Sequence, residues 1–151
     1  MKEFKSVNDI LDFAMNEEQM AVDFYRELAE NSKTDDMRQV FTEFAEEEIR
    51  HKQRLLKIEE EGFYKLEPEQ VADLKIADYM VNVKPSPNMT YEEALVLAMK
   101  KEKAAFKLYI ALADRAPTAP LKNVFMSLAQ EESKHKLRFE IEYDEYVLRE
   151  N

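Results

Sequence analysis

The chain contains an internal repeat, because residues 6–54 align with residues 90–138 without a gap at a constant offset of 84 positions. Identical pairs at this offset include Leu11 and Leu95, Met15 and Met99, Leu28 and Leu112, Val40 and Val124, and Phe41 and Phe125. A gapless repeat of this length predicts one structural unit that occurs twice and packs against its own copy. The fold must therefore consist of two similar halves related by a pseudo-twofold axis.

Apolar residues recur in both copies at the three- and four-residue spacing of an amphipathic helix, so each copy is predicted to form two helices. In the first copy these residues are Val7, Leu11, Ala14, Ala21, Tyr25 and Leu28, then Met37, Phe41, Phe44, Leu55 and Ile58. In the second copy they are Tyr91, Leu95, Ala98, Ala105, Tyr109 and Leu112, then Leu121, Phe125, Leu128 and Phe139. One Gly and five Pro among 151 residues also favour long helices over turns.

Each predicted helix begins at a residue that can cap its first turn. These N-caps are Ser6, Thr34, Thr90 and Thr118, and Asp9 and Glu93 complete capping boxes with the first and third. We expect the first helix to end near Asn31 and the second at Gly62, whereas the third ends before Pro117. The fourth helix is expected to continue to about Leu148.

Residues 63–89 separate the two copies and break the helical pattern with Pro68, Pro85 and Pro87. They contain one short candidate helix, at about 69–80. A connection of about 28 residues is long enough to run the length of a four-helix bundle. We therefore predict a single all-α domain over 1–151, an antiparallel four-helix bundle with one hairpin at 6–62, a crossover at 63–89 and a second hairpin at 90–150.

Six polar residues occupy positions on the predicted core faces that should be apolar: Glu18, Glu48, His51, Glu102, Glu132 and His135. Four buried carboxylates would repel one another and lose their hydration, and each would cost several kcal/mol unless it were neutralised. Protons could neutralise them, and so could two divalent cations. A glutamate from each of two helices, with Glu-x-x-His from each of the other two, is the ligand set of di-iron and di-manganese bundles. Carboxylates with two imidazoles suit iron or manganese.

A surface salt bridge is the competing interpretation of these motifs. A single Glu-x-x-His sequence is weak evidence for a metal, because glutamate is frequent in this chain and the same spacing supports ion pairs on a helix. The motif occurs at both histidines of the chain, His51 and His135, at equivalent positions on the predicted core face. This repetition favours the metal interpretation.

Two further repeated pairs have a functional and a structural interpretation. Tyr25 and Tyr109 are either buried aromatics or residues that donate to ligand carboxylates and line the site of the oxidant. Glu47 and Glu131 lie on a solvated face or contact the histidines. Several methionines are predicted to fill the core: Met15, Met20, Met37, Met99 and Met126.

Composition excludes several classes of partner. The formal net charge of −10 argues against nucleic acid and anionic membranes and suits a protein that attracts cations. The absence of cysteine removes disulfides, thiolate zinc sites and iron–sulfur clusters. The first residues contain no apolar signal segment, and no apolar run is long enough to cross a bilayer. We therefore expect a cytoplasmic protein.

The chain resembles the ferritin-like superfamily, and most closely its rubrerythrin-type di-iron domains. The resemblance rests on the Glu-x-x-His motifs, on the tyrosines seven residues after Glu18 and Glu102, and on the long crossover. The resemblance covers nearly the whole chain. It implies that two iron ions, or manganese, are bridged by Glu48 and Glu132. Glu18 and Glu102 would then be terminal ligands, and His51 and His135 would each bind one metal.

Two departures from the rubrerythrin pattern affect the expected chemistry. Those proteins usually carry a rubredoxin-like domain with cysteine pairs, so this chain is expected to take electrons from an external donor protein. They also have an extra glutamate three residues from the third-helix ligand, whereas this chain has Met99 and Ala105 on either side of Glu102. The resemblance further implies a homodimer, and the long crossover would permit an exchange of helix pairs.

Three functions fit this pattern. The leading hypothesis is an oxidoreductase that reduces hydrogen peroxide at the di-iron site. The second is a ferroxidase or iron-handling protein that uses dioxygen at the same site. The third is a bundle protein with a structural metal and an interaction role.

Overall fold

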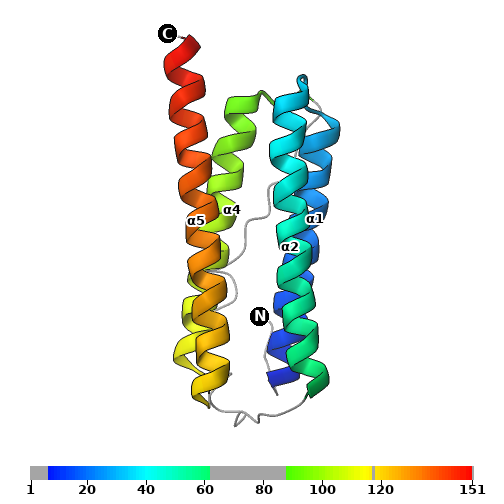
Figure 1. Ribbon diagram of the computed structural model, residues 1–151, viewed down its shortest axis with the longest axis vertical. Coiled ribbons are helices and arrows are strands. Elements are labelled where there is room, and N and C mark those ends of the chain that lie inside the picture. The colour runs from blue at the N-terminus through cyan, green and yellow to red at the C-terminus, as the bar shows by residue number, and fades with distance from the viewer. Residues whose placement is uncertain (1–6, 62–87, 117, 151) are drawn as a thin grey trace.

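The computed structural model describes residues 7–61, 88–116 and 118–150. In these ranges the chain forms four helices, which are α1 (Val7–Glu30), α2 (Asp35–Glu61), α4 (Tyr91–Asp114) and α5 (Ala119–Glu150) (Figure 1). No strand occurs in the described part. The all-α prediction is therefore confirmed, and α5 extends slightly beyond the predicted end near residue 148.

The helices form two antiparallel hairpins that lie side by side, α1 with α2 and α4 with α5 (Figure 1). Helix α2 ends at the opposite end of the bundle from the start of α4. The described ends of the hairpins thus require a crossover instead of a short turn, as the sequence predicts. The predicted short helix at 69–80 lies outside the described residues.

Hydroxyl side chains begin three of the helices. Thr34 Oγ1 and Thr118 Oγ1 each accept a hydrogen bond from the backbone N–H three residues later, at 3.2 and 3.4 Å. Thr90 forms a complete capping box with Glu93. These contacts satisfy backbone donors that have no partner within the helix. The fourth predicted N-cap, Ser6, lies outside the described residues.

Two apolar clusters fill the bundle, one toward each end. The first draws on all four helices and includes Leu11, Leu55, Leu112 and Leu128. The second also draws on all four and includes Phe41, Phe44, Leu95 and Phe139. Each fully buried side chain of this kind stabilises the fold by about 1.5–3 kcal/mol. Along every helix the predicted polar ligands lie between the two clusters, at the middle level of the bundle.

The methionines divide between the core and the surface. Met15 is buried, and Met37 and Met99 pack against the core while partly buried. Met20 and Met126 are 37% and 41% exposed, so the core-filler prediction is wrong for these two. Each is adjacent to a core position in sequence, and adjacent positions on a helix point in different directions.

Candidate metal centre

All six predicted ligands are buried at the centre of the bundle. Their exposed fractions are 3% for Glu18, 2% for Glu48, 3% for His51, 2% for Glu102, 0% for Glu132 and 8% for His135. Helices α1 and α4 each contribute one carboxylate, whereas α2 and α5 each contribute a carboxylate and an imidazole. The structure therefore brings together every side chain that the sequence singled out for metal binding.

The six side chains form two overlapping groups of four. In each group, one atom from every residue lies within 4.8 Å of the others. The first group is Glu18, Glu48, His51 and Glu132, and the second is Glu48, Glu102, Glu132 and His135; a third, smaller group joins Glu48 with both histidines. Only Glu48 and Glu132 belong to both groups of four, which is the position that a carboxylate shared by two metals would occupy.

The Nδ1 atoms of both histidines face these carboxylates. His51 Nδ1 lies 2.6 Å from Glu132 Oε1, 3.4 Å from Glu48 Oε1 and 3.6 Å from Glu18 Oε2. His135 Nδ1 lies 3.4 Å from Glu48 Oε1 and 3.6 Å from Glu102 Oε2. The two imidazole rings are nearly parallel, with centroids 5.7 Å apart. One Nδ1 is thus available to each group.

Several buried polar atoms of this cluster have no hydrogen-bond partner in the described part of the chain. They are Glu18 Oε2, Glu48 Oε1, His51 Nδ1, Glu102 Oε2, both carboxylate oxygens of Glu132, and His135 Nδ1. The close approach of His51 to Glu132 lacks the alignment of a hydrogen bond. Buried polar groups are rarely left unpaired, because each costs about 1–3 kcal/mol. The free atoms and their donor types fit a di-iron site.

Burial and mutual repulsion change the acidity of the two shared carboxyls. Burial raises the pKa of Glu48 well above its ordinary value, and the charges of Glu18 and Glu102 raise it further. The pKa of Glu132 is raised for the same reasons, by burial and then by its carboxylate neighbours. Without metal, both groups therefore favour the protonated form. Metal binding must displace these protons.

The pKa of the second histidine is also raised, but for a different reason. Burial alone would lower the pKa of His135, but the nearby carboxylates of Glu102, Glu47 and Glu48 outweigh it and raise that pKa to about 12. For Glu102, burial acts to raise the pKa, but the nearby Glu132 and His135 lower it below its ordinary value.

The two predicted tyrosines contact the carboxylates of α1 and α4 across the hairpin boundary. The Tyr25 hydroxyl in α1 donates to Glu102 in α4, and the Tyr109 hydroxyl in α4 donates to Glu18 in α1. Burial raises the pKa of both phenols well above 10.0, and the carboxylates that they contact raise it further. Both tyrosines therefore remain protonated donors. Their part in a reaction stays a prediction.

Glu47 and Glu131, whose role the sequence left open, contact the outward-facing nitrogens of the histidines. His135 Nε2 pairs with Glu47, and His51 Nε2 lies 3.4 Å from Glu131 Oε2. The close approach of His135 is the main reason that the pKa of Glu47 is lowered. Each glutamate contacts the histidine of the other hairpin, although Glu47 and His51 are four residues apart on one helix, a spacing that would suggest their direct pairing.

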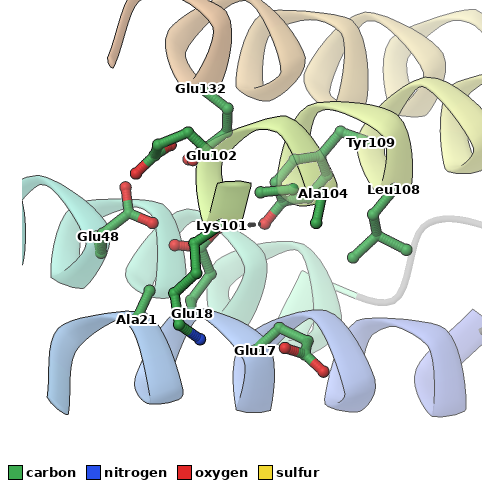
Figure 2. Close-up of a pocket in the computed structure, with 11 residues that line it drawn as sticks. Glu17, Glu18, Ala21, Glu48, Lys101, Glu102, Ala104, Leu108, Tyr109 and Glu132 are labelled. Atoms are coloured by element: carbon green, nitrogen blue, oxygen red, sulfur yellow. Dashed lines mark hydrogen bonds between the residues drawn. The ribbon is translucent and has the colours of Figure 1, made fainter. Parts of the chain in front are cut away.

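A small cavity of about 40 Å³ opens between α1 and α4 and reaches all four carboxylates of the cluster. Figure 2 shows Glu48, Glu102 and Glu132 pointing toward one another beside it. Lys101 and Glu17, which the sequence analysis did not single out, also line the cavity. They occupy equivalent positions of the repeat, each just before a ligand-type glutamate. The volume is sufficient for a molecule of one or two heavy atoms.

The fold and this site define a class. A four-helix bundle with a long crossover, whose buried glutamates and histidines fit a di-iron site, is a ferritin-like carboxylate protein. The family model for Rubrerythrin matches residues 9–143. The chain therefore belongs to the Rubrerythrin family.

Two solved structures with the same fold are similar to this chain. One, from Thermotoga maritima, is a proposed ferritin-like diiron-carboxylate protein, with a TM-score of 0.78 and 23% identity over 97% of this chain and 99% of that chain. The other is a hypothetical protein from Pyrococcus furiosus, with a TM-score of 0.67 and 24% identity over 89% of this chain and 86% of that one. At these identities the likeness extends to the fold alone.

No curated protein matches this sequence. Among the described helices, none combines the length and the apolar character that a membrane span requires.

Proposed function

We propose that this protein is a di-iron oxidoreductase that reduces hydrogen peroxide with electrons from a separate donor protein. The observation that carries the proposal is the cavity between α1 and α4, which is too small for an organic substrate and touches all four cluster carboxylates. A site of this size suits an oxidant of two heavy atoms.

Two ferrous ions, when bound, would supply the two electrons that break the O–O bond of hydrogen peroxide, which takes up two protons to give two water molecules. The chain holds the ions with four carboxylates and two imidazole Nδ1 atoms, so the four positive charges match the four negative ones. The surrounding apolar clusters keep bulk water away and strengthen these interactions. Manganese would fit the same donors.

Tyr25 and Tyr109 are proposed to fix the terminal carboxylates. Each phenol is completely buried and donates to one oxygen of Glu102 or Glu18, so the other oxygen remains directed at the metal position. Because both phenols stay protonated, they keep these hydrogen bonds to the terminal carboxylates. Tyr109 also lines the oxidant cavity.

A ferroxidase or iron-handling role is the second candidate. The cavity is lined by the cluster glutamates, with Glu17 opposed by Lys101, and the whole chain has a formal net charge of −10. The excess of negative charge favours the entry of ferrous ions. In that function iron would be the substrate and dioxygen the oxidant. A structural metal in an interaction protein is the third candidate.

The test begins with anaerobic titration of the metal-free protein with Fe(II), followed by rapid mixing with hydrogen peroxide or with dioxygen. We expect two ions per chain and faster oxidation by peroxide, with repeated turnover once a chemical reductant is supplied. Faster reaction with dioxygen, together with uptake of further iron, would instead support the ferroxidase. Metal binding without turnover by either oxidant would support the structural role.

A further inference from the structure

The residues around the outer nitrogens of the two histidines, which we call the outer layer, differ in charge at one position of the repeat. Three residues of this layer are the same in both hairpins at the offset of 84, namely the glutamates 47 and 131, the histidines 51 and 135, and the arginines 54 and 138. A fourth position is cationic in both, as Arg50 and Lys134. The fifth position is Glu43 in α2 and Ser127 in α5, so a negative charge is present in only one half of the layer.

On the His51 side, an arginine holds the supporting carboxylate. One terminal nitrogen of Arg54 donates a hydrogen bond to Glu131 Oε2 at 2.6 Å, and the other donates to Ser127 Oγ at 3.1 Å. The same Glu131 oxygen is 3.4 Å from His51 Nε2. The stronger contact of Glu131 is therefore with the guanidinium, because a charged pair at 2.6 Å outweighs a long approach to an imidazole.

On the His135 side, the equivalent arginine is directed elsewhere. Arg138 donates to Glu43 Oε2 at 3.1 Å and lies over the ring of Phe44, 5.0 Å from its centroid. Glu47 is left to pair with His135, and a terminal nitrogen of Arg50 lies 4.0 Å from its other carboxylate oxygen. Glu43 thus draws away the arginine that would otherwise compete for Glu47, a role that the uncharged Ser127 cannot fill for Arg54.

A carboxylate that accepts from the outer nitrogen of a metal-bound histidine orients the ring and makes it a better ligand. We propose that the Glu43/Ser127 difference makes the two metal positions inequivalent, with the position at His135 binding a divalent ion more tightly than the position at His51. Glu43 acts as a positioning residue through Arg138 and Glu47. This inference rests on the metal centre of the proposed function, but it does not depend on which oxidant is used.

The size of the effect is limited by solvent. The side chains of Arg54 and Glu131 are 38% and 41% exposed, so their ion pair is partly screened. Loss of an outer partner costs roughly 10–100-fold in metal affinity. Because Glu131 is weakened as a partner and not removed, we expect a ratio near the lower end, about tenfold between the two positions.

The experiment is a titration of the metal-free full-length chain with Co(II), followed by its visible absorption and by the paramagnetically shifted N–H signals of the two metal-bound imidazoles. The wild type should fill in two steps, and the signal of the His135 ring should appear first. Ser127→Glu should draw Arg54 from Glu131, strengthen the weaker step and merge the two. Ser127→Gln, which has similar size but no charge, should leave both steps in place.

The converse variant tests the other half. Glu43→Ser should release Arg138 onto Glu47, weaken the first step and also merge the two, and the double variant should reverse the order of filling. A wild type with two equal sites, or equal effects of Ser127→Glu and Ser127→Gln, would overturn the proposal. Failure to turn over peroxide would leave these binding steps intact, whereas the absence of any tight Co(II) site would remove the metal centre itself and this inference with it.

Discussion

The α1–α2 hairpin and the α4–α5 hairpin carry the same ligand-type residues and tyrosines at the site but differ in parts of its surroundings. The glutamates, histidines and tyrosines of the site recur at the offset of 84. At the cavity mouth Glu17 is matched by Lys101, in the outer layer Glu43 is matched by Ser127, and α5 is 32 residues long where α2 has 27. The comparison teaches that the site constrains both hairpins equally, whereas the surroundings of each half are free to differ.

The polar contacts that surround the site join the two hairpins. Each tyrosine donates to a glutamate of the opposite hairpin, and each outer glutamate contacts the opposite histidine. Contacts within one hairpin, such as those of His51 with Glu18 and Glu48, are the minority at the centre. Substitutions at equivalent positions therefore test whether the two hairpins contribute equally to metal binding and to the free energy of unfolding.

The largest effect is expected for the shared carboxylates. Glu48→Gln and Glu132→Gln should each abolish tight binding at both positions, because each residue belongs to both ligand groups. Glu18→Gln and Glu102→Gln should each remove one ion and leave one. We expect the shared variants to lose more than the roughly 100-fold that an outer partner can contribute. Metal analysis after gel filtration, with helical content as a control for folding, measures the stoichiometry. A Glu48→Gln protein that retains one tight ion would contradict the bridging assignment.

Metal loading should stabilise the bundle by joining its halves. With Mn(II) at 100 times the dissociation constant, each site should add about 2.7 kcal/mol to the free energy of unfolding. For a chain of this size, this corresponds to a rise in Tm of about 5–10 °C per site. Calorimetry with Mn(II), with Mg(II) and with a chelator makes the measurement. An equal response to Mg(II), which does not favour imidazole ligands, would indicate a nonspecific charge effect.

The tyrosines provide the next comparison. Tyr25→Phe and Tyr109→Phe should each destabilise the metal-loaded protein by about 1.5–3 kcal/mol, because each removes a hydrogen bond to a buried carboxylate. The two losses should be equal if the halves are equivalent around the site. Tyr91→Phe is the control, since its hydroxyl bonds Glu142 at 2.9 Å away from the centre and is only half-buried. Chemical denaturation of the three variants measures these losses. A large difference between the free energies lost in Tyr25→Phe and in Tyr109→Phe would contradict the symmetric arrangement.

The smallest effect concerns a pair that only the first hairpin contains. Glu59 hydrogen-bonds Asp12, and this bond, with some burial and repulsion from Asp12 and Glu60, raises the pKa of Glu59 from 4.5 to about 7. The equivalent residues of the second hairpin are Tyr143 and Val96. The folded protein binds this proton more tightly than the unfolded chain does, so the contribution is present below pH 4.5 and is lost as the pH rises through about 7.

We expect this loss to be below about 1 kcal/mol, because the pair lies near the surface. Glu59→Gln should remove this pH-dependent loss of stability. The free energy of unfolding of the variant should therefore rise relative to that of the wild type as the pH goes from 4.5 to 7. Glu60→Gln, which removes only a minor contribution, should retain most of the pH dependence. A constant difference across this range would show that the two carboxyls do not share a proton.

The repeat and its polar interruptions predicted the four helices, three described N-caps and the burial of six ligand-type residues, because periodicity and internal symmetry are properties of the sequence itself. They did not predict the crossed contacts. Glu47 and His51 are four residues apart on one helix, and only the packing of the hairpins shows that Glu47 meets His135 instead. The exposure of Met20 depends likewise on how α1 is rotated about its axis, which composition alone does not set.

The crossed contacts also have a consequence for how the chain folds. Within each hairpin the packing helices are neighbours in sequence, so each hairpin can form by closing a short loop. The bonds that complete the site join residues 77 or 91 positions apart. Because folding slows as contacting residues become more distant along the chain, we expect the hairpins to form first and to dock in a later, slower step. Uptake of metal would then follow the kinetics of that docking step, and the rate at which the centre fills would time the last event of folding.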